Sequence, residues 1–287
     1  MTTSAPRPGR QPFGDRLVDQ IQQWGPLCVG LDPHPHLLAG WGLPDTAEGL
    51  RSFSQAVLDA AADRCAAVKP QSAFYERHGS AGIAVLEEVL AGCSERGLLS
   101  VLDAKRGDIG STMEGYAQAY LQDGSPLAAD AVTLSPYLGY GSLRPALDLA
   151  AGTGRGVFVL GLTSNPEGAE VQLAGRPTVA ARILEQVAQD NAGASVCGHV
   201  GLVVGATLPR APAELGLDLA ASGAPILTPG VGAQGADEHD VARTFAGLTE
   251  RVLVPISRGV LGAGPDVAAL AGAVERWSDR LALALRA

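Results

Sequence analysis

The segment LLSVLDAKRGDIGST, residues 98–112, changes from a strand pattern to the start of a helix. Its first residues are mostly apolar, as in a strand that is buried on both faces. Gly107 permits a sharp turn, and Gly110, Ser111 and Thr112 suit the beginning of a helix. The segment therefore predicts the strand, turn and helix unit from which parallel α/β folds are built.

Similar units recur along the chain, with short Val- and Leu-rich runs between longer amphipathic stretches. The candidate strands are residues 27–32, 66–70, 98–105, 130–136, 156–164, 199–207, 224–230 and 251–259. The clearest candidate helices are residues 49–65, 81–97, 178–193 and 265–287. This alternation favours an α/β fold, a single (β/α)₈ TIM barrel of the usual length of about 250 residues. An open doubly wound sheet is the structural alternative.

No Gly/Ser linker or change in composition divides the 287 residues. We therefore expect a flexible N-terminal arm over residues 1–20 and one barrel catalytic domain over residues 21–287. The arm lacks the apolar stretch of a secretory signal, and apolar runs elsewhere are too short or interrupted to span a bilayer. We expect a cytoplasmic protein that does not bind membranes.

Charge and cysteine spacing exclude further classes. A net charge of −9, with no long basic run, argues against a nucleic-acid partner. The four cysteines are far apart and form no Cys-x-x-Cys pair, so neither a zinc knuckle nor a dithiol redox site is indicated. His34 and His36 lie between prolines with no third ligand nearby, and we expect an exposed loop and no metal site there.

Polar residues stand before proline where several of the candidate strands end. The pairs are Asp32-Pro33, Lys69-Pro70, Ser135-Pro136, Asn165-Pro166 and Thr228-Pro229. Proline cannot donate to a strand ladder and favours an extended residue before it. Any one pair is explained as an ordinary strand terminator. Because all five pairs follow an apolar run at its carboxyl end, together they favour a barrel with its chemistry at the carboxyl ends of the strands.

Charged residues gather at the end of the third candidate strand. Period-two geometry puts Asp103 and Lys105 on one face, and Asp108 follows the turn at Gly107. With Lys69 on the preceding strand, acids and bases would alternate, and the carboxylates would keep a lysine charged although burial opposes this. Such a lysine suits a reaction that creates negative charge on carbon and needs a proton there. Ordinary salt bridges at a strand end are the competing interpretation.

Two later segments predict a phosphate site. ILTPGVGAQGAD (226–237) and VLVPISRGV (252–260) fall on the seventh and eighth candidate strands, after which barrels frequently hold phosphate. Glycines in the first segment allow close backbone approach, Gln234 supplies an amide and Arg258 offers a planar fork for phosphate oxygens. Simple turn chemistry would explain the glycines alone.

These motifs together resemble the orotidine 5′-phosphate decarboxylase family, in its longer bacterial subgroup. The resemblance runs from about Leu27 to Gly264 and rests on segments that occur in the family's order. They are CVGLDPHP, AVKPQSAFYERHG, DAKRGDIGST, LTSNPEGAE, LTPGVGAQGAD and PISRG. The chain departs from shorter members of the family at residues 135–145 and 195–219, which leaves Ser135, Tyr137 and Tyr140 without an assigned role.

The resemblance implies a homodimeric barrel with shared active sites. It implies conversion of orotidine 5′-monophosphate to UMP and CO₂ in de novo pyrimidine biosynthesis, without a cofactor. Lys105 matches the lysine that protonates C6, and Asp103 matches the acid near the departing carboxylate. The remaining matches are Asp32 and Lys69 for the ribose, Ser164 for the pyrimidine, Gln234 and Arg258 for the phosphate, and Asp108, Ile109 and Thr112 for the neighbouring subunit's site.

Two alternatives follow from the same residues. The first is a metal-dependent sugar-phosphate decarboxylase or synthase of the same barrel superfamily, which would share the Asp-x-Lys-x-x-Asp pattern. The second is a non-catalytic barrel that binds a phosphorylated ligand, because a fold alone does not establish activity.

Overall fold

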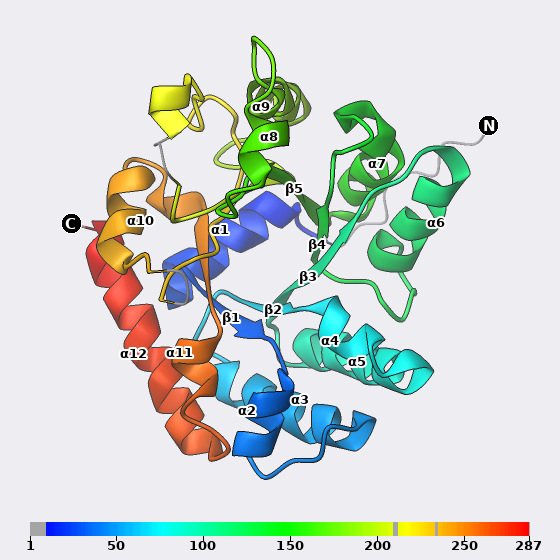
Figure 1. The fold of residues 1–287 in the computed structure, drawn as a ribbon, viewed down its shortest axis with the longest axis vertical. Helices are drawn as coiled ribbons and strands as arrows, with labels where there is room; N and C mark the ends of the chain where they lie inside the picture. Colours follow the sequence, from blue (N-terminus) through cyan, green and yellow to red (C-terminus); the bar gives the residue numbers. More distant parts are fainter. Residues whose placement is uncertain (1–9, 209–211, 233–234, 287) are drawn as a thin grey trace.

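The computed structural model describes residues 10–208, 212–232 and 235–286. The described residues form a closed barrel of parallel strands in the order β1 to β8, seen end-on in Figure 1. The strands are β1 Leu27–Leu31, β2 Ala67–Pro70, β3 Leu99–Arg106, β4 Ala131–Leu134, β5 Gly156–Leu162, β6 Val200–Val204, β7 Ile226–Leu227 and β8 Val252–Ile256. The predicted single (β/α)₈ barrel is therefore confirmed, and the open sheet is wrong.

Helices surround the barrel and connect its strands (Figure 1). The α-helices are α1 Phe13–Trp24, α2 Pro35–Gly40, α3 Ala47–Ala61, α4 Ser72–Glu76, α5 Gly79–Glu95, α6 Gly110–Leu121, α7 Arg144–Thr153, α8 Gly168–Gln172, α9 Val179–Asp190, α10 Glu238–Thr244, α11 Arg258–Leu261 and α12 Val267–Arg286. Short 3₁₀ helices are η1 Tyr140–Leu143, η2 Pro212–Leu215 and η3 Thr249–Arg251. The four quoted helical stretches are confirmed with small shifts at their ends.

Alternate residues of the strands belong to two separate hydrophobic clusters. Val29, Leu102 and Val132 join the larger cluster, which also holds apolar residues of the surrounding helices. Val101 and Ala131 join a smaller cluster with residues from several other strands. The period of two in a strand explains this division, since successive side chains point to opposite faces. Both faces are thus buried, and polar side chains are left for the ends of the strands.

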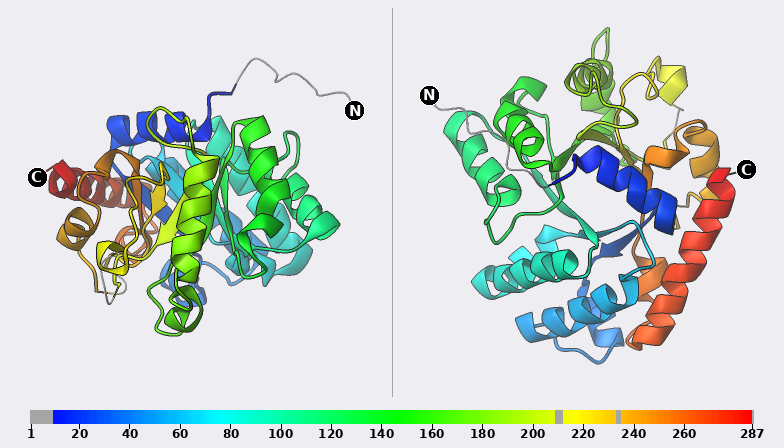
Figure 2. Two further views of the ribbon diagram at one scale, coloured as in Figure 1. Left: turned by 90° about the horizontal axis from the view of Figure 1, so that it is seen from above. Right: turned by 180° about the vertical axis from the view of Figure 1, so that it is seen from behind.

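Helix α1 closes one end of the barrel, as the right-hand view of Figure 2 shows. Phe13 is fully buried and packs edge-on against Phe158 of β5, with ring centroids 5.9 Å apart. A Cβ atom at Gly156 would lie 2.3 Å from the Phe13 ring, so glycine makes this approach possible. The expected flexible arm over residues 1–20 is therefore corrected: the chain is helical from Phe13, because its apolar side chains seal the barrel floor.

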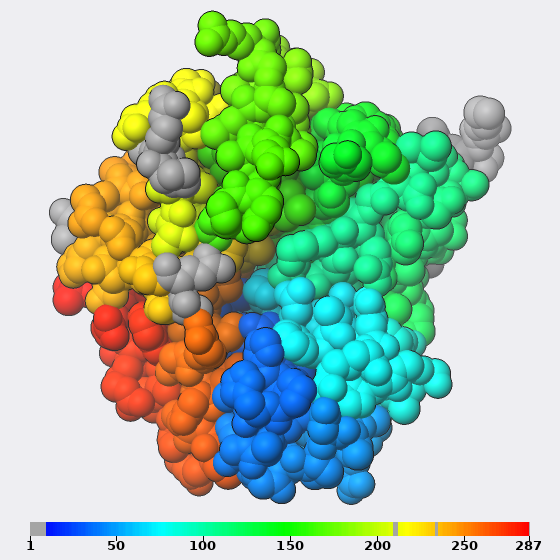
Figure 3. Space-filling model, viewed as in Figure 1, coloured from blue at the N-terminus to red at the C-terminus, as the bar shows by residue number. Residues whose placement is uncertain are grey.

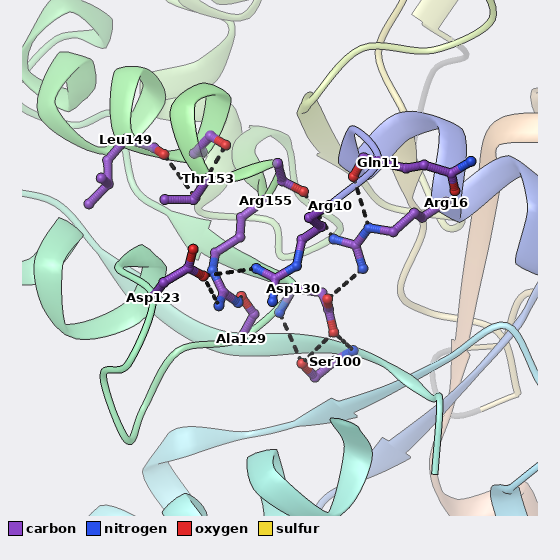
Figure 4. A network of polar contacts seen from close by, with 12 residues as sticks. Arg10, Gln11, Arg16, Ser100, Asp123, Ala129, Asp130, Leu149, Thr153 and Arg155 are labelled. Atoms are coloured by element: carbon purple, nitrogen blue, oxygen red, sulfur yellow. Dashed lines mark hydrogen bonds and ion pairs between the residues drawn. The ribbon is translucent and has the colours of Figure 1, made fainter. Parts of the chain in front are cut away.

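A polar network fixes α1 to this end of the barrel (Figure 4). Arg16 Nη1 lies 2.6 Å from Asp130 Oδ1, and Arg16 Nη2 donates to the Gly154 carbonyl at 3.0 Å. The other oxygen of Asp130 accepts the backbone N–H and the hydroxyl of Ser100, each at 3.0 Å. With this end closed, the barrel is open to ligands at the opposite end, where the strands have their carboxyl termini.

Candidate active site

A cavity of 780 Å³ lies at the carboxyl ends of the strands. Figure 3 views the molecule from this side and shows a recess near the centre of the face. Elements around the whole barrel supply its walls, in agreement with the usual position of active sites in this fold. The residues proposed from the sequence that line it are Asp32, Lys69, Asp103, Lys105, Ser164 and Arg258.

Asp103 lies between the two lysines that the sequence singled out. Lys105 Nζ lies 2.6 Å from Asp103 Oδ1, and Lys69 Nζ lies 3.1 Å from Asp103 Oδ2. Lys69 Nζ is also 3.9 Å from Asp32 Oδ1. Asp103 is only 8% exposed. The prediction that the heads of Asp103 and Lys105 meet is confirmed, and Lys69 joins the same array.

Charge in this array outweighs the effect of burial on protonation. Burial disfavours the charged form of Lys69, yet the carboxylates of Asp103 and Asp32 raise its pKa above the ordinary value. Burial likewise opposes ionisation of Asp103, but Lys69, Lys105 and the Thr133 hydroxyl together lower its pKa well below the usual range. Asp103 is therefore a carboxylate and Lys69 an ammonium at neutral pH.

The backbone at the end of β3 is bent. Lys105 has a φ of 46°, in the left-handed region that non-glycine residues rarely adopt. The β3–β4 ladder is irregular between Leu102 and Arg106, so the chain leaves the regular strand at this point. The Lys105 side chain remains 46% exposed and lines the cavity, whereas Asp103, two residues earlier, is buried. Gly107 follows, where a Cβ atom would lie 2.2 Å from the Ser135 carbonyl oxygen.

Asp108, Ile109 and Thr112 do not line this cavity in the described part of the chain. The Asp108 carboxylate accepts the backbone N–H of Ile109 at 2.8 Å. Ile109 is 61% exposed, and Thr112 on the first turn of α6 is exposed as well. The pattern of two carboxylates flanking Lys105 is therefore not formed within one chain, where Asp103 is the carboxylate beside it.

The glycine-rich segment and Arg258 lie at the β7 and β8 side of the cavity. Gly230 and Gly232 line it with φ values of 123° and 71°, which a side chain would strain. Arg258 lines it from the start of α11, next to Ser257. Gln234 falls outside the described residues. The described part of this region therefore offers glycine backbone and the Arg258 guanidinium after the seventh and eighth strands, where barrels commonly hold phosphate.

Some polar residues of the cavity were not foreseen. Thr133 of β4 donates to Asp103 Oδ1 at 2.8 Å, and the Ser257 hydroxyl donates to Asp32 Oδ2. Asp32 Oδ1 is buried and has no hydrogen-bond partner among the described residues. Thr133 was detectable in principle, because it is the polar residue in the inward phase of an otherwise apolar strand. Ser257 stands directly beside Arg258, which the sequence had selected.

A second cavity of 680 Å³ adjoins the first and shares Lys105, Leu160, Thr163 and Asn165 with it. Its walls include Ser135, Tyr137 and Tyr140, whose roles the sequence left open. The Tyr140 hydroxyl donates to Asp190 of α9 at 2.5 Å, so this tyrosine holds η1 against α9. Tyr137 is 78% exposed.

Within the described ranges, no cluster of three or more His, Cys, Asp and Glu side chains is placed to hold a metal ion. In the same residues, no helix has both the length and the apolar character needed to cross a membrane.

Closed (β/α)₈ barrels with charged side chains gathered at the carboxyl ends of the strands form a class of enzymes, and the chain has the architecture of this class. Within it, the chain belongs to the orotidine 5′-phosphate decarboxylase / HUMPS family, whose model matches residues 25–273. The resemblance proposed from the motifs is thus confirmed.

Relatives named orotidine 5′-phosphate decarboxylase are similar over nearly their whole length. The one from Salinispora arenicola is 55% identical, over 92% of this chain and 95% of its own. The one from Streptomyces coelicolor is 52% identical, over 96% and 99%. A solved structure from Streptomyces avermitilis, provisionally given the same name, has a TM-score of 0.93 at 50% identity and covers 99% of this chain and 100% of its own.

Proposed function

We propose that the chain converts orotidine 5′-monophosphate to UMP and CO₂ in pyrimidine biosynthesis, and that Lys105 protonates C6. The observation that carries this proposal is the array in which Asp103, buried and ionised, lies between Lys105 and Lys69 at the mouth of the barrel. Family membership and the names of relatives at 52–55% identity support the same reaction.

In the proposed mechanism, the bond from C6 to the carboxylate breaks and CO₂ leaves. The electron pair stays on C6, where the pyrimidine ring cannot delocalise it well. The Lys105 ammonium stabilises this charge and donates a proton to form the C6–H bond, after which solvent reprotonates the amine. Asp103 holds the ammonium in place from 2.6 Å and lies near the departing carboxylate. Because the donor is already oriented, little reorganisation is needed at the moment of reaction.

Substrate groups remote from C6 would be bound around the rest of the cavity. Asp32 and Lys69 would contact the ribose, and the buried Asp32 Oδ1 is an acceptor suited to a ribose hydroxyl. Ser164 would bond the pyrimidine, while Arg258 and Gln234 would hold the phosphate. Binding energy from these groups can fix the reacting carbon against Lys105.

We also propose a homodimer with shared active sites. Asp108, Ile109 and Thr112 lie outside the cavity of their own chain, and Ile109 is an exposed apolar side chain beside the end of β3. Both features fit residues that enter the site of a second subunit. Mixing inactive Lys105→Ala and Asp108→Ala chains after reversible dissociation should then restore about a quarter of the sites, because half of the dimers carry one intact site. Each variant alone is the control, and no recovery on mixing would contradict shared sites.

A cytoplasmic location belongs to the same proposal. The described cysteines Cys28, Cys65, Cys93 and Cys197 are buried free thiols, as is usual in a reducing compartment.

The reaction is tested by following the loss of orotidine-monophosphate absorbance with purified protein treated with a chelator. We expect full turnover, with UMP as product. No loss of orotidine-monophosphate absorbance, together with metal-dependent turnover of a sugar phosphate, would favour the sugar-phosphate alternative. Binding of UMP without turnover would favour the non-catalytic alternative. In either case the proposed reaction would be wrong.

A further inference from the structure

Thr133 of β4 contacts both Asp103 and Lys105, the two residues on which the proposed chemistry depends. It is 1% exposed and shares the inward phase of the strand with Ala131. Its hydroxyl donates to Asp103 Oδ1 at 2.8 Å and accepts the backbone N–H of Lys105 at 2.9 Å. Asp103 Oδ1 is the same oxygen that lies 2.6 Å from Lys105 Nζ. The contacts therefore close a small ring through Thr133, Asp103 and the backbone and side chain of Lys105.

The direction of each hydrogen bond in this ring is determined by chemistry. A backbone N–H can only donate, so Thr133 Oγ1 must accept from Lys105. An ionised carboxylate can only accept, so the Thr133 proton points to Asp103. The low pKa of Asp103 is consistent with this polarity, because hydrogen bonds to the charged form favour it. Oδ1 of Asp103 then has two fixed donors, the Thr133 hydroxyl and the Lys105 ammonium.

The ring also explains how the unusual backbone of Lys105 is held. The ladder between β3 and β4 is regular up to Leu102 paired with Val132 and resumes at Arg106 with Leu134. Lys105 falls in the irregular interval with a φ of 46°, a conformation that residues other than glycine rarely adopt. Its N–H is satisfied by a side chain, Thr133 Oγ1, where a backbone carbonyl would serve in a regular strand.

We propose that Thr133 is a positioning residue for the reaction: it holds the Lys105 backbone in this bend and fixes the Asp103 oxygen that aims the ammonium. The inference rests on the proposed function and adds to it a residue outside the charged array. Thr133 also lines the cavity beside Lys105, but it carries no charge, and its hydroxyl proton is directed at Asp103 and not at the substrate. Its effect should therefore act on the turnover of bound substrate.

The test compares Thr133→Val, which keeps the shape and removes the hydroxyl, with Thr133→Ser, which keeps the hydroxyl. We expect Thr133→Val to lower kcat roughly 10- to 100-fold, the size of a lost hydrogen bond to a charged group, with KM changed less than about threefold. Thr133→Ser should stay within about threefold of the unsubstituted chain. A residue that only filled space would show the reverse order, because valine fills the site better than serine.

The unsubstituted chain and the affinity of each variant for UMP serve as controls. Should Thr133→Val fail to fold, Thr133→Ala against Thr133→Ser makes the same comparison, and equal kcat values for that pair overturn the inference. Full turnover by Thr133→Val, or a raised KM with unchanged kcat, also overturns it while the proposed reaction stands. No turnover by the unsubstituted chain overturns the reaction and this inference together.

Discussion

At the carboxyl ends of the strands Asp103 lies between two lysines, and at the amino ends Asp130 is held by Arg16 and Ser100 (Figure 4). The surroundings of the two carboxylates differ. Asp130 lies behind α1, and both its oxygens are occupied by partners within the network. Near Asp103 there is an open cavity, a buried Asp32 oxygen without a hydrogen-bond partner in the described residues, and a bent backbone at Lys105.

The difference shows how similar ion pairs come to serve stability at one end and chemistry at the other. A buried charge is costly unless it is paired and hydrogen-bonded, and a fully satisfied network mainly holds elements together. A site with an unused hydrogen-bond acceptor and a strained backbone has not used all its polar groups for folding. Those groups remain available for a ligand. Substitutions around Asp103 should therefore mainly lower turnover, whereas substitutions around Asp130 should mainly lower stability.

The largest expected effect on turnover comes from Lys105→Ala. We expect kcat to fall by about 10³-fold or more, since both the proton donor and its positive charge are lost. The side chain is 46% exposed, but its loss removes one partner of the buried Asp103, so the free energy of unfolding should fall by about 1 kcal/mol. Steady-state kinetics and a denaturant titration on the same preparation measure both quantities. Near-normal turnover would contradict the role given to Lys105.

Asp130→Asn tests the opposite end. The asparagine amide would place its NH₂ group against either Arg16 or the Ser100 N–H. Losing that hydrogen bond and the negative charge should lower the free energy of unfolding by about 1–3 kcal/mol. For a chain of this size that corresponds to a fall in Tm of roughly 2–4 °C per kcal/mol. We expect kcat per folded molecule to stay within about twofold. A large loss of kcat without a change in Tm would remove the distinction between the two ends.

The sequence predicted most of the fold because the strands are largely apolar and several of them end in a polar residue before proline. It was less accurate where local patterns compete. Residues 224–230 read as a strand, but only Ile226–Leu227 are one, since Pro225 and Pro229 cannot donate to the ladder. Helix α1 was missed although Phe13, Leu17 and Ile21 follow a helical spacing, because a short segment at the chain start resembles an arm.

The site was predicted in part for similar reasons. Strand periodicity was enough to place Asp103 with Lys105, because both belong to one strand. It could not find the ring through Thr133, which depends on the register between β3 and β4 and on the bend at Lys105. Nor could spacing alone decide where Asp108 acts, since the turn at Gly107 carries it away from its own cavity.

A smaller effect is expected in the pH dependence of stability. The pKa of Asp103 is lower in the folded chain than the value of about 3.9 in an unfolded one. Its contribution to stability is therefore fully present above about pH 4 and is lost as the pH falls through the folded-state pKa. The free energy of unfolding should thus decline below pH 4 more steeply in the unsubstituted chain than in Asp103→Asn.

Denaturant titrations of both chains between about pH 2 and pH 6 measure this difference. Asp130→Asn is the matched control, because it removes a carboxylate at the opposite end of the barrel. Since Asp103 is already ionised well below neutrality, the difference in stability between the unsubstituted chain and Asp103→Asn should be constant from pH 5 to pH 6. Parallel pH profiles of the two chains below pH 4 would mean that Asp103 titrates at its ordinary pKa in the folded chain. The lysines would then not hold it as a carboxylate, and the electrostatic contrast between the two ends of the barrel would be lost.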